Sequence, residues 1–246
     1  MSGKIEAVGI GPGGYEGMTV QAARALADCD LIIGYTVYVE LIRKHFEGKR
    51  MLSTPMRQEK ERCILAFEEA EKGQHVAMIC SGDAGVYGMA GLLYELRASK
   101  ESWRDIEIEG IPGVTAAVSG AALLGAPLMG DFAVISLSDL LVPWDVIEKR
   151  LRAASEADMV ICLYNPGSHK RRDHLKRACK IMMEYKSPDT VCGITENIGR
   201  EGQSCRVLSL KELEEYPADM FTTVFAGNTG TNILDGRMVT NRGYII

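Results

Sequence analysis

The segment Ser81-Gly82-Asp83-Ala84-Gly85 holds residue types that could bind a small molecule. It follows the apolar run 76–80 and precedes residues 86–96, where apolar side chains recur at helical spacing. This order predicts a buried parallel strand, a tight glycine turn and a helix. Glycines let a ligand approach the backbone, and Asp83 adds an acceptor, so the turn suits hydroxyls, amines or positive charge. An ordinary turn capped by Asp83 fits the same residues.

A second glycine-rich loop, residues 9–14, follows the predicted strand 5–10 and contains the spacing G-x-G-x-x-G. That spacing occurs in dinucleotide-binding loops, so a nicotinamide-dependent oxidoreductase is an alternative function. Two features count against it. The loop continues to Met18 and the next helix is predicted to begin at Thr19, and the second strand, 31–34, ends without Asp or Glu.

Polar and aromatic residues follow other predicted strands. Tyr35 and Tyr38 come just after strand 31–34, where they could stack on a flat ligand or pack into the core. Asn165 follows the apolar strand 159–164. Because carboxyl ends of parallel strands form ligand crevices, these positions are candidates for a binding site.

Residues 169–185 predict an amphipathic helix with a strongly basic face. A solvated face and a patch that receives a small polyanion both fit, since the rest of the chain is acidic. His169 and His174 are five residues apart, which does not fit a helical metal-binding pair.

The composition narrows the class of protein. The chain has 246 residues and a formal net charge of −5, which argues against nucleic-acid binding. Its seven cysteines show no C-x-x-C spacing and several lie in apolar runs, so we expect reduced core thiols and no metal site. No signal peptide or membrane span is expected, and these features predict a cytoplasmic protein.

The predicted elements describe an α/β protein of two domains, 1–124 and 125–246. Repeated strand–helix units in the first half predict a parallel sheet. Residues 125–130, with Pro127, resemble a linker. The second half combines such units with a polar hairpin at 196–203, which predicts a mixed sheet.

Several of these segments together resemble the motifs of the tetrapyrrole (class III) methyltransferases, and the resemblance covers essentially the whole chain. The matching segments are 9–13 with Thr19, 80–88, 112–116, 164–166 and 222–227. Segments 34–38, 82–87, 136–144, 164–166 and 199–202 are typical of the branch that methylates carbon 17 of precorrin-3B or cobalt-factor III. Many relatives have Pro where this chain has Ala84, and Ala is usual for that branch.

The resemblance implies a two-domain homodimer that binds S-adenosylmethionine in a trough between the domains and acts in cobalamin biosynthesis. The cofactor contacts that it implies, carried over residue by residue, are Pro12, Ser81, Gly82, Asp83, Val86, Tyr87, Thr115, Ala116, Tyr164, Asn165, Ile198 and Thr222. Several of these positions are the strand ends that the residue pattern indicates independently.

The implied reaction moves a methyl group to carbon 17 of a tetrapyrrole and contracts the ring. Positioning and desolvation can accelerate the transfer without an enzyme nucleophile. Ring contraction needs proton movement, for which the candidate residues are Asp139, Tyr38, Glu196 and Ser138. The substrate carboxylates need cationic partners, and candidate substrate-binding residues are Tyr35, Arg171, Arg172 and Arg200.

Other functions fit parts of the same pattern. A methyltransferase of this family could act on another ring carbon or on a protein-borne diphthine precursor. A tetrapyrrole carrier could hold the substrate without chemistry. The segments 34–38 and 138–144 favour carbon 17.

Overall fold

The computed structural model describes residues 3–168 and 171–244. The chain divides into two compact units, Met1–Thr115 and Ala116–Ile246. The sequence placed a domain boundary after residue 124, and the difference is helix α5 (Ala116–Leu124). Residues of α5 share a core with strands of the second unit, so the division falls after Thr115.

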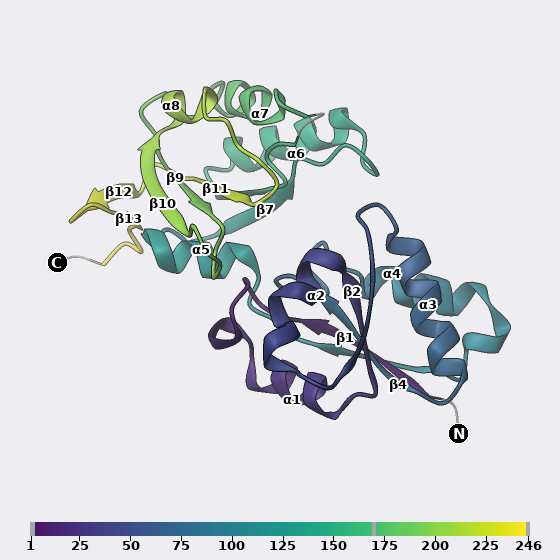
Figure 1. The fold of residues 1–246 in the computed structure, drawn as a ribbon. Helices are drawn as coiled ribbons and strands as arrows, with labels where there is room; N and C mark the ends of the chain where they lie inside the picture. Colours follow the sequence, from purple (N-terminus) through teal and green to yellow (C-terminus); the bar gives the residue numbers. More distant parts are fainter. Residues whose placement is uncertain (1–2, 169–170, 245–246) are drawn as a thin grey trace. The chain divides into compact units, whose positions relative to one another are not determined.

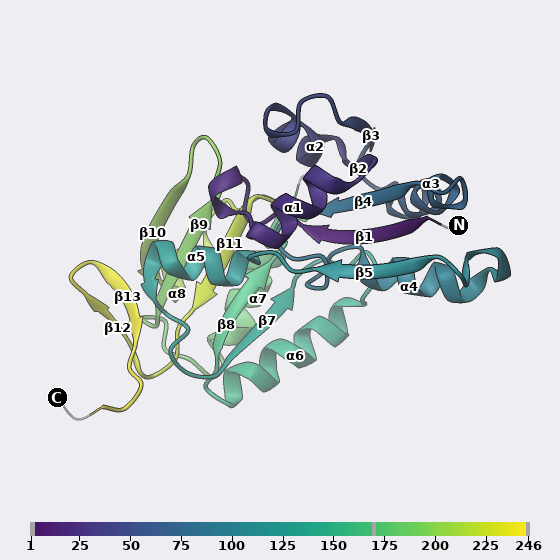
Figure 2. The ribbon, with the colours of Figure 1, turned by 90° about the horizontal axis from the view of Figure 1, so that it is seen from below.

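The first unit is built on a five-stranded sheet in the order β3-β2-β4-β1-β5. Every neighbouring pair is parallel, as the sequence predicted, and Figure 2 shows β4, β1 and β5 side by side. The strands are β1 (Lys4–Gly9), β2 (Leu31–Tyr35), β3 (Arg50–Thr54), β4 (His75–Cys80) and β5 (Glu107–Ile111).

Helices cover both faces of this sheet (Figure 1). The core on one face contains α1 (Val20–Asp28) and α2 (Thr36–Ile42), and the core on the other contains α3 (Glu59–Glu71) and α4 (Ala90–Ser99). Short 3-10 helices lie at Tyr15–Gly17, Arg43–His45 and Glu101–Trp103. Side chains of β1 alternate between the faces, because Ile5 and Ala7 join one core and Val8 joins the other. Burial on both faces explains the continuous apolar runs of β2 and β4.

The second unit contains a sheet in the order β10-β9-β11-β8-β7. The strands are β7 (Phe132–Ser136), β8 (Val160–Tyr164), β9 (Val191–Glu196), β10 (Ser204–Ser209) and β11 (Thr222–Ala226). Strands β7 and β8 pair in parallel and the other pairs are antiparallel, which confirms the predicted mixed sheet. The main core of this unit contains α6 (Trp144–Glu156), α7 (His174–Met182) and α8 (Leu210–Glu214), and α5 belongs to a second core.

A small third sheet joins β6 (Gly125–Ala126), β13 (Arg237–Thr240) and β12 (Thr231–Leu234). The segment 125–130 therefore begins with a paired strand, where the sequence predicted a linker.

Helix α5 is rich in small residues because it packs closely on its neighbours. A Cβ built on Gly120 would lie 2.8 Å from Thr195 Oγ1 and 2.9 Å from the ring of Phe225. A stretch of small residues permits close packing or leaves room for a ligand, and at Gly120 the structure shows close packing.

Two helices begin later than the sequence predicted. The helix predicted from residue 86 begins at Ala90, since residues 81–89 form the preceding turn. The basic helix begins at His174, and residues 169 and 170 of that prediction lie outside the described residues. Across residues 3–168 and 171–244, no helix is both long and apolar enough to span a membrane.

Candidate active site

Three turns meet at the carboxyl edge of the first sheet. They follow β1, β4 and β5 and comprise residues 10–18, 81–89 and 112–115. Strands β1 and β4 are neighbours, but the strands that follow them in the chain lie in opposite directions across the sheet. After β1 the chain continues to β2, which lies beyond β4, and after β4 it continues to β5, which lies beyond β1. Such a divergence is a topological switch point, where open parallel sheets bind their ligands.

The first two turns are hydrogen-bonded to each other through their glycines. Gly11 N–H donates to Gly82 O over 3.0 Å, and Gly82 N–H donates to Gly11 O over 2.7 Å. Both residues have left-handed φ angles, +74° for Gly11 and +67° for Gly82, which glycine adopts without steric cost.

The third turn packs directly on the other two. A Cβ built on Gly113 would lie 2.1 Å from Gly82 O and 2.5 Å from Gly9 O. A Cβ on Gly9 would likewise lie 2.7 Å from both Gly113 N and Gly82 O. Real Cβ atoms do not approach backbone atoms so closely, so glycine at these positions lets the three turns come together.

Asp83 uses its carboxylate to hold these turns. Its Oδ1 accepts the Gly85 N–H over 2.8 Å and its Oδ2 accepts the Gly113 N–H over 2.9 Å. Thr19 adds a second link, because its hydroxyl donates to Pro112 O and accepts the Ala22 N–H, each over 3.0 Å. The sequence identified Thr19 as a helix cap, which is confirmed, but did not indicate its bond to Pro112.

The predicted cofactor contacts of the first unit all lie on these turns. Pro12, Ser81 and Thr115 are half-buried, whereas Val86 and Tyr87 are exposed. Tyr87 also has a left-handed φ of +54°, an uncommon conformation for a bulky side chain. The structure thus gathers residues from three separate segments at one edge of the sheet.

Tyr35 and Tyr38 lie at the same edge, at the end of β2 and in the first turn of α2. Their rings meet edge to face, with centroids 5.1 Å apart. The guanidinium of Arg62 lies 5.9 Å from the Tyr35 ring, and Tyr38 packs against the core. Both tyrosines are half-buried, so each combines a packing role with partial access to solvent.

The second unit gathers its predicted residues in the same way. Strands β7, β8 and β9 end at one edge of the sheet, and β11 begins there, with Thr222 paired to Glu196. Asn165 has a left-handed φ of +54°, and its side-chain amide donates to Ser136 Oγ over 2.9 Å. The Tyr164 hydroxyl accepts the Ala117 N–H over 2.6 Å and so satisfies a backbone donor in the first turn of α5, which Ala116 begins.

Two further predicted cofactor contacts are buried at this edge. Ile198 is 8% exposed and Thr222 is 2% exposed. The Thr222 hydroxyl donates to Asp219 Oδ1 over 2.9 Å. Thr222 thus has a side-chain partner within its own loop.

The loop after β7 holds Ser138 and Asp139. Arg171 donates hydrogen bonds to the hydroxyls of Ser138 and Ser168. Asp139 Oδ2 lies 3.5 Å from Nε2 of His174, the first residue of α7. The sequence excluded His174 from a helical metal-binding pair and placed it within a helix over residues 169–185, so no pattern indicated this contact. Arg172 is exposed beside these residues.

Glu196 lies at the end of β9 with both carboxylate oxygens occupied. Oε1 accepts the Tyr216 hydroxyl over 3.0 Å and Oε2 accepts the Ser204 hydroxyl over 2.9 Å. Burial, together with the bond to Glu196, raises the pKa of the Tyr216 hydroxyl. Arg200, in the adjoining loop, stacks 5.5 Å from the Phe221 ring centroid. These contacts orient Glu196 and Arg200 without burying them completely.

The cysteines behave as core residues. Six are buried and Cys205 is exposed, and all seven are free thiols. Burial raises the pKa of Cys29 to about 11 and that of Cys63 to about 12. Within residues 3–168 and 171–244, no three His, Cys, Asp or Glu side chains form a group that could hold a metal ion.

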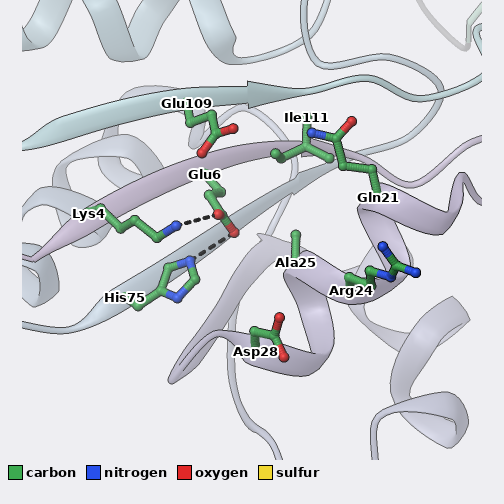
Figure 3. A pocket seen from close by; sticks show the side chains of 9 residues that line it. All are labelled: Lys4, Glu6, Gln21, Arg24, Ala25, Asp28, His75, Glu109 and Ile111. Carbon is green, nitrogen blue, oxygen red and sulfur yellow. Dashed lines mark hydrogen bonds and ion pairs between the residues drawn. The ribbon is translucent and has the colours of Figure 1, made fainter.

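The first unit also has a pocket of about 420 Å³, lined by residues of α1 and of strands β1, β4 and β5 (Figure 3). It contains the buried Glu6, whose carboxylate lies 2.6 Å from Lys4 Nζ and 2.8 Å from His75 Nε2. Lys4 and His75 are the first residues of their strands, whereas Ile111, which also lines the pocket, is the last residue of β5.

Comparison with known proteins identifies the family to which this sequence is similar. Residues 4–214 match the family model of Tetrapyrrole (Corrin/Porphyrin) Methylases. The chain is 46% identical to a Salmonella typhimurium protein named "Probable cobalt-factor III C(17)-methyltransferase", over 98% of this chain and 100% of that protein. It is 44% identical to "Cobalt-factor III methyltransferase" of Priestia megaterium, over 99% of this chain but only 46% of that longer protein.

Solved structures of methyltransferases have a fold similar to that of this chain. The crystal structure of the methyltransferase CobJ is 35% identical, with a TM-score of 0.91 over 98% of this chain and 100% of that one. A Thermus thermophilus uroporphyrin-III C-methyl transferase complexed with S-adenyl homocysteine shares the fold, with 18% identity and a TM-score of 0.70 over 91% of this chain and 97% of that one. The chain therefore belongs to the tetrapyrrole (corrin/porphyrin) methylase family.

Proposed function

We propose that this chain is an S-adenosylmethionine-dependent methyltransferase that methylates carbon 17 of cobalt-factor III, with ring contraction, in cobalamin biosynthesis. The observation that carries the proposal is the junction of three glycine turns at the switch point of the first sheet. The implied cofactor contacts of the first unit lie on those turns, although residues 12, 81–87 and 115 are distant in the sequence.

The residues on these turns fit the proposed cofactor. Val86 supplies exposed apolar surface for an adenine ring, while Ser81 and the adjoining backbone supply polar groups for hydroxyls. Asp83 supports this surface indirectly, because its carboxylate oxygens bond the backbone of two turns. Contacts from Ala116, Tyr164, Asn165, Ile198 and Thr222, and the trough that the resemblance implies, remain predictions.

The choice of substrate rests on the relatives. Four of them, 40% to 46% identical to this chain, carry cobalt-factor III in their names. A metal-free precorrin-3B is the alternative substrate. The second unit offers Arg172 and Arg200, two partly or fully exposed cations, for the carboxylates that either tetrapyrrole carries.

The chain's contribution to the reaction is mainly positioning. S-adenosylmethionine, when bound, supplies an electrophilic methyl group, and the tetrapyrrole supplies the carbon that attacks it. Rigid turns hold the donor, and cationic side chains orient the acceptor, so that two reactants meet in a fixed geometry. Exclusion of water at the reacting carbon adds to the acceleration. Asp139, Glu196, Tyr38 and Ser138 remain the candidates for moving protons during ring contraction.

Calorimetric titration with S-adenosylhomocysteine tests the cofactor, with NADH as the control ligand. We expect micromolar binding of S-adenosylhomocysteine and no binding of NADH. Binding of NADH alone would favour the alternative function, a nicotinamide-dependent oxidoreductase that uses the glycine-rich loop at residues 9–14. Absence of both would contradict the assignment of the turns as a cofactor site.

Anaerobic turnover with cobalt-factor III and with metal-free precorrin-3B tests the substrate. Mass spectrometry should show one added methyl group, and carbon-13 labelling should place it at carbon 17. Methylation at another ring position would support a different branch of the family. Sedimentation of the same protein tests the predicted homodimer.

A further inference from the structure

His174 is a buried histidine whose ring has defined partners on two sides. It is 5% exposed and begins α7, where its ring centroid lies 4.7 Å from that of Trp144. A buried imidazole needs hydrogen-bond partners for its nitrogens, so those partners determine where its proton lies.

The Nδ1 atom of His174 lies 2.9 Å from the backbone oxygen of Leu137. A carbonyl oxygen can only accept a hydrogen bond, so Nδ1 carries a proton. In the neutral ring, Nε2 is therefore the nitrogen with the free lone pair.

A carboxylate lies near Nε2. Nε2 lies 3.5 Å from Asp139 Oδ2, and both atoms are acceptors unless a proton lies on one of them. The side chain of Asp139 is 37% exposed and that of His174 is 6% exposed. The pair thus has an outer member that a substrate can reach and an inner member that can hold a proton.

Several charged side chains lie around the pair and bond to its neighbours. Arg171 is held by the hydroxyls of Ser138 and Ser168, in the loops on either side of the pair. Arg177, one turn along α7, lies 4.0 Å over the Trp144 ring. Glu148 of α6 interacts with both Trp144 and Arg152. Asp173 caps α7 next to His174 without a side-chain capping bond.

We propose that Asp139 and His174 act as one proton-accepting unit in the ring-contraction step, with Asp139 facing the substrate and His174 as its positioning residue. The inference rests on the proposed function and assigns one of its open roles. A substrate O–H bond breaks as Asp139 takes the proton, and the substrate oxygen keeps the electron pair of that bond. The new Asp139 O–H bond then breaks as an N–H bond forms at Nε2 of His174. The pair gains one proton, which it returns to the product or to solvent at the end of the cycle.

A structural explanation is that His174 only holds the loop at Leu137. The variant His174→Asn separates the two roles, because an asparagine side-chain N–H can replace Nδ1–H as the donor to the Leu137 carbonyl but offers no basic nitrogen. If the role is structural, this variant retains activity. If the proposal holds, kcat for ring contraction falls about 10²-fold in His174→Asn and in Asp139→Asn, with KM changed by less than about threefold.

A double-variant cycle tests whether the two residues act together. Because they form one unit, the double variant should lose no more activity than either single variant. Asp173→Asn, which removes a neighbouring carboxylate at the same helix start, is the matched control and should keep full activity. Multiplicative losses in the double variant would overturn the proposal.

Nitrogen-15 NMR of histidine-labelled protein gives a readout without substrate. The chain has four histidines, so His174→Asn assigns the His174 signals by their disappearance. We expect the neutral ring to be the Nδ1–H tautomer, and an Nε2–H tautomer would overturn the proposal. Wild-type protein that methylates no tetrapyrrole would overturn the proposed function together with this inference, whereas full activity in Asp139→Asn would overturn this inference alone.

Discussion

Replacing Gly113 with alanine tests whether the three glycine turns form one packed junction. The new Cβ would lie 2.1 Å from Gly82 O and 2.5 Å from Gly9 O, both backbone atoms of other turns. Gly113 does not have a left-handed φ, so alanine is penalised by lack of space and not by its backbone conformation. The substitution therefore isolates the close approach of the turns.

The expected cost has two sources. Overpacking a tight site costs about 1–3 kcal/mol. The turn must also move, which weakens the 2.9 Å bond from Gly113 N–H to Asp83, and a bond to a charged group contributes about 1.5–3 kcal/mol. We expect Gly113→Ala to lower the free energy of unfolding of the first unit by about 3 kcal/mol and to weaken S-adenosylhomocysteine binding at least about tenfold.

The assay can follow the first unit by itself. The chain has two tryptophans, Trp103 in the first unit and Trp144 in the second. In a Trp144→Phe background, fluorescence during urea unfolding reports on Trp103, which stacks on Phe67 in the first core. Gly110→Ala is the matched control, since nothing lies within 4 Å of its Cβ. A loss below about 1 kcal/mol, or one equal to that of Gly110→Ala, would refute the reasoning.

Further predictions concern other contacts. Asp83→Ala should destabilise the first unit by about 2 kcal/mol and Asp83→Asn by less, because the amide keeps one acceptor oxygen; urea unfolding measures both. Gly120→Ala should lower the stability of the second unit by about 1–3 kcal/mol in thermal unfolding, because the new Cβ has no space. Gly91→Ala should raise the stability of the first unit by about 0.5–1 kcal/mol, because Gly91 lies in helix α4 and its Cβ would meet nothing within 4 Å. A thiol reagent at pH 8 should label Cys205 alone in the native protein, since burial raises the pKa of the other six thiols; mass spectrometry counts the labels. Hydrogen bonds from a lysine and an arginine lower the pKa of Glu69, so its contribution to stability is present above about pH 4.5 and is lost as the pH falls further; the stability difference between wild type and Glu69→Gln should shrink between pH 6 and pH 3.

The buried strands of the first unit were predictable from their apolar runs. Strands β1 and β4 are buried on both faces, so their apolar runs identify them directly. Helix α2 was not predicted, because its seven residues include five that are β-branched or aromatic and favour strands. Strand β3 was also missed, since it lies at the sheet edge and only its middle residues are apolar.

The sequence predicted at which strand ends the candidate residues lie, but not which hydrogen bonds they make. Motif residues at strand ends identified both edges, because parallel strands bring their carboxyl ends together. The sequence left two interpretations of Gly82 and Asp83 open, the approach of a ligand and an ordinary turn capped by Asp83. In the structure, Gly82 bonds to Gly11 and both Asp83 oxygens bond backbone N–H groups, one of them 30 residues away. A glycine or a carboxylate has the same local signature whether it meets a ligand or another turn.

His174 shows the same limit in the second unit. Its partners Leu137 and Asp139 lie 37 and 35 positions earlier in the chain, and no local pattern connects them. The fold supplies the connection, since α7 starts beside the loop that leaves β7, and a buried ring there must find an acceptor for its Nδ1 proton. A residue that acts through a neighbour distant in the sequence becomes visible only when the hydrogen bonds on both sides of its side chain are known. The residue types in the sequence therefore indicate which chemistry is possible. The hydrogen bonds between residues distant in the sequence determine which of those side chains can take part in it.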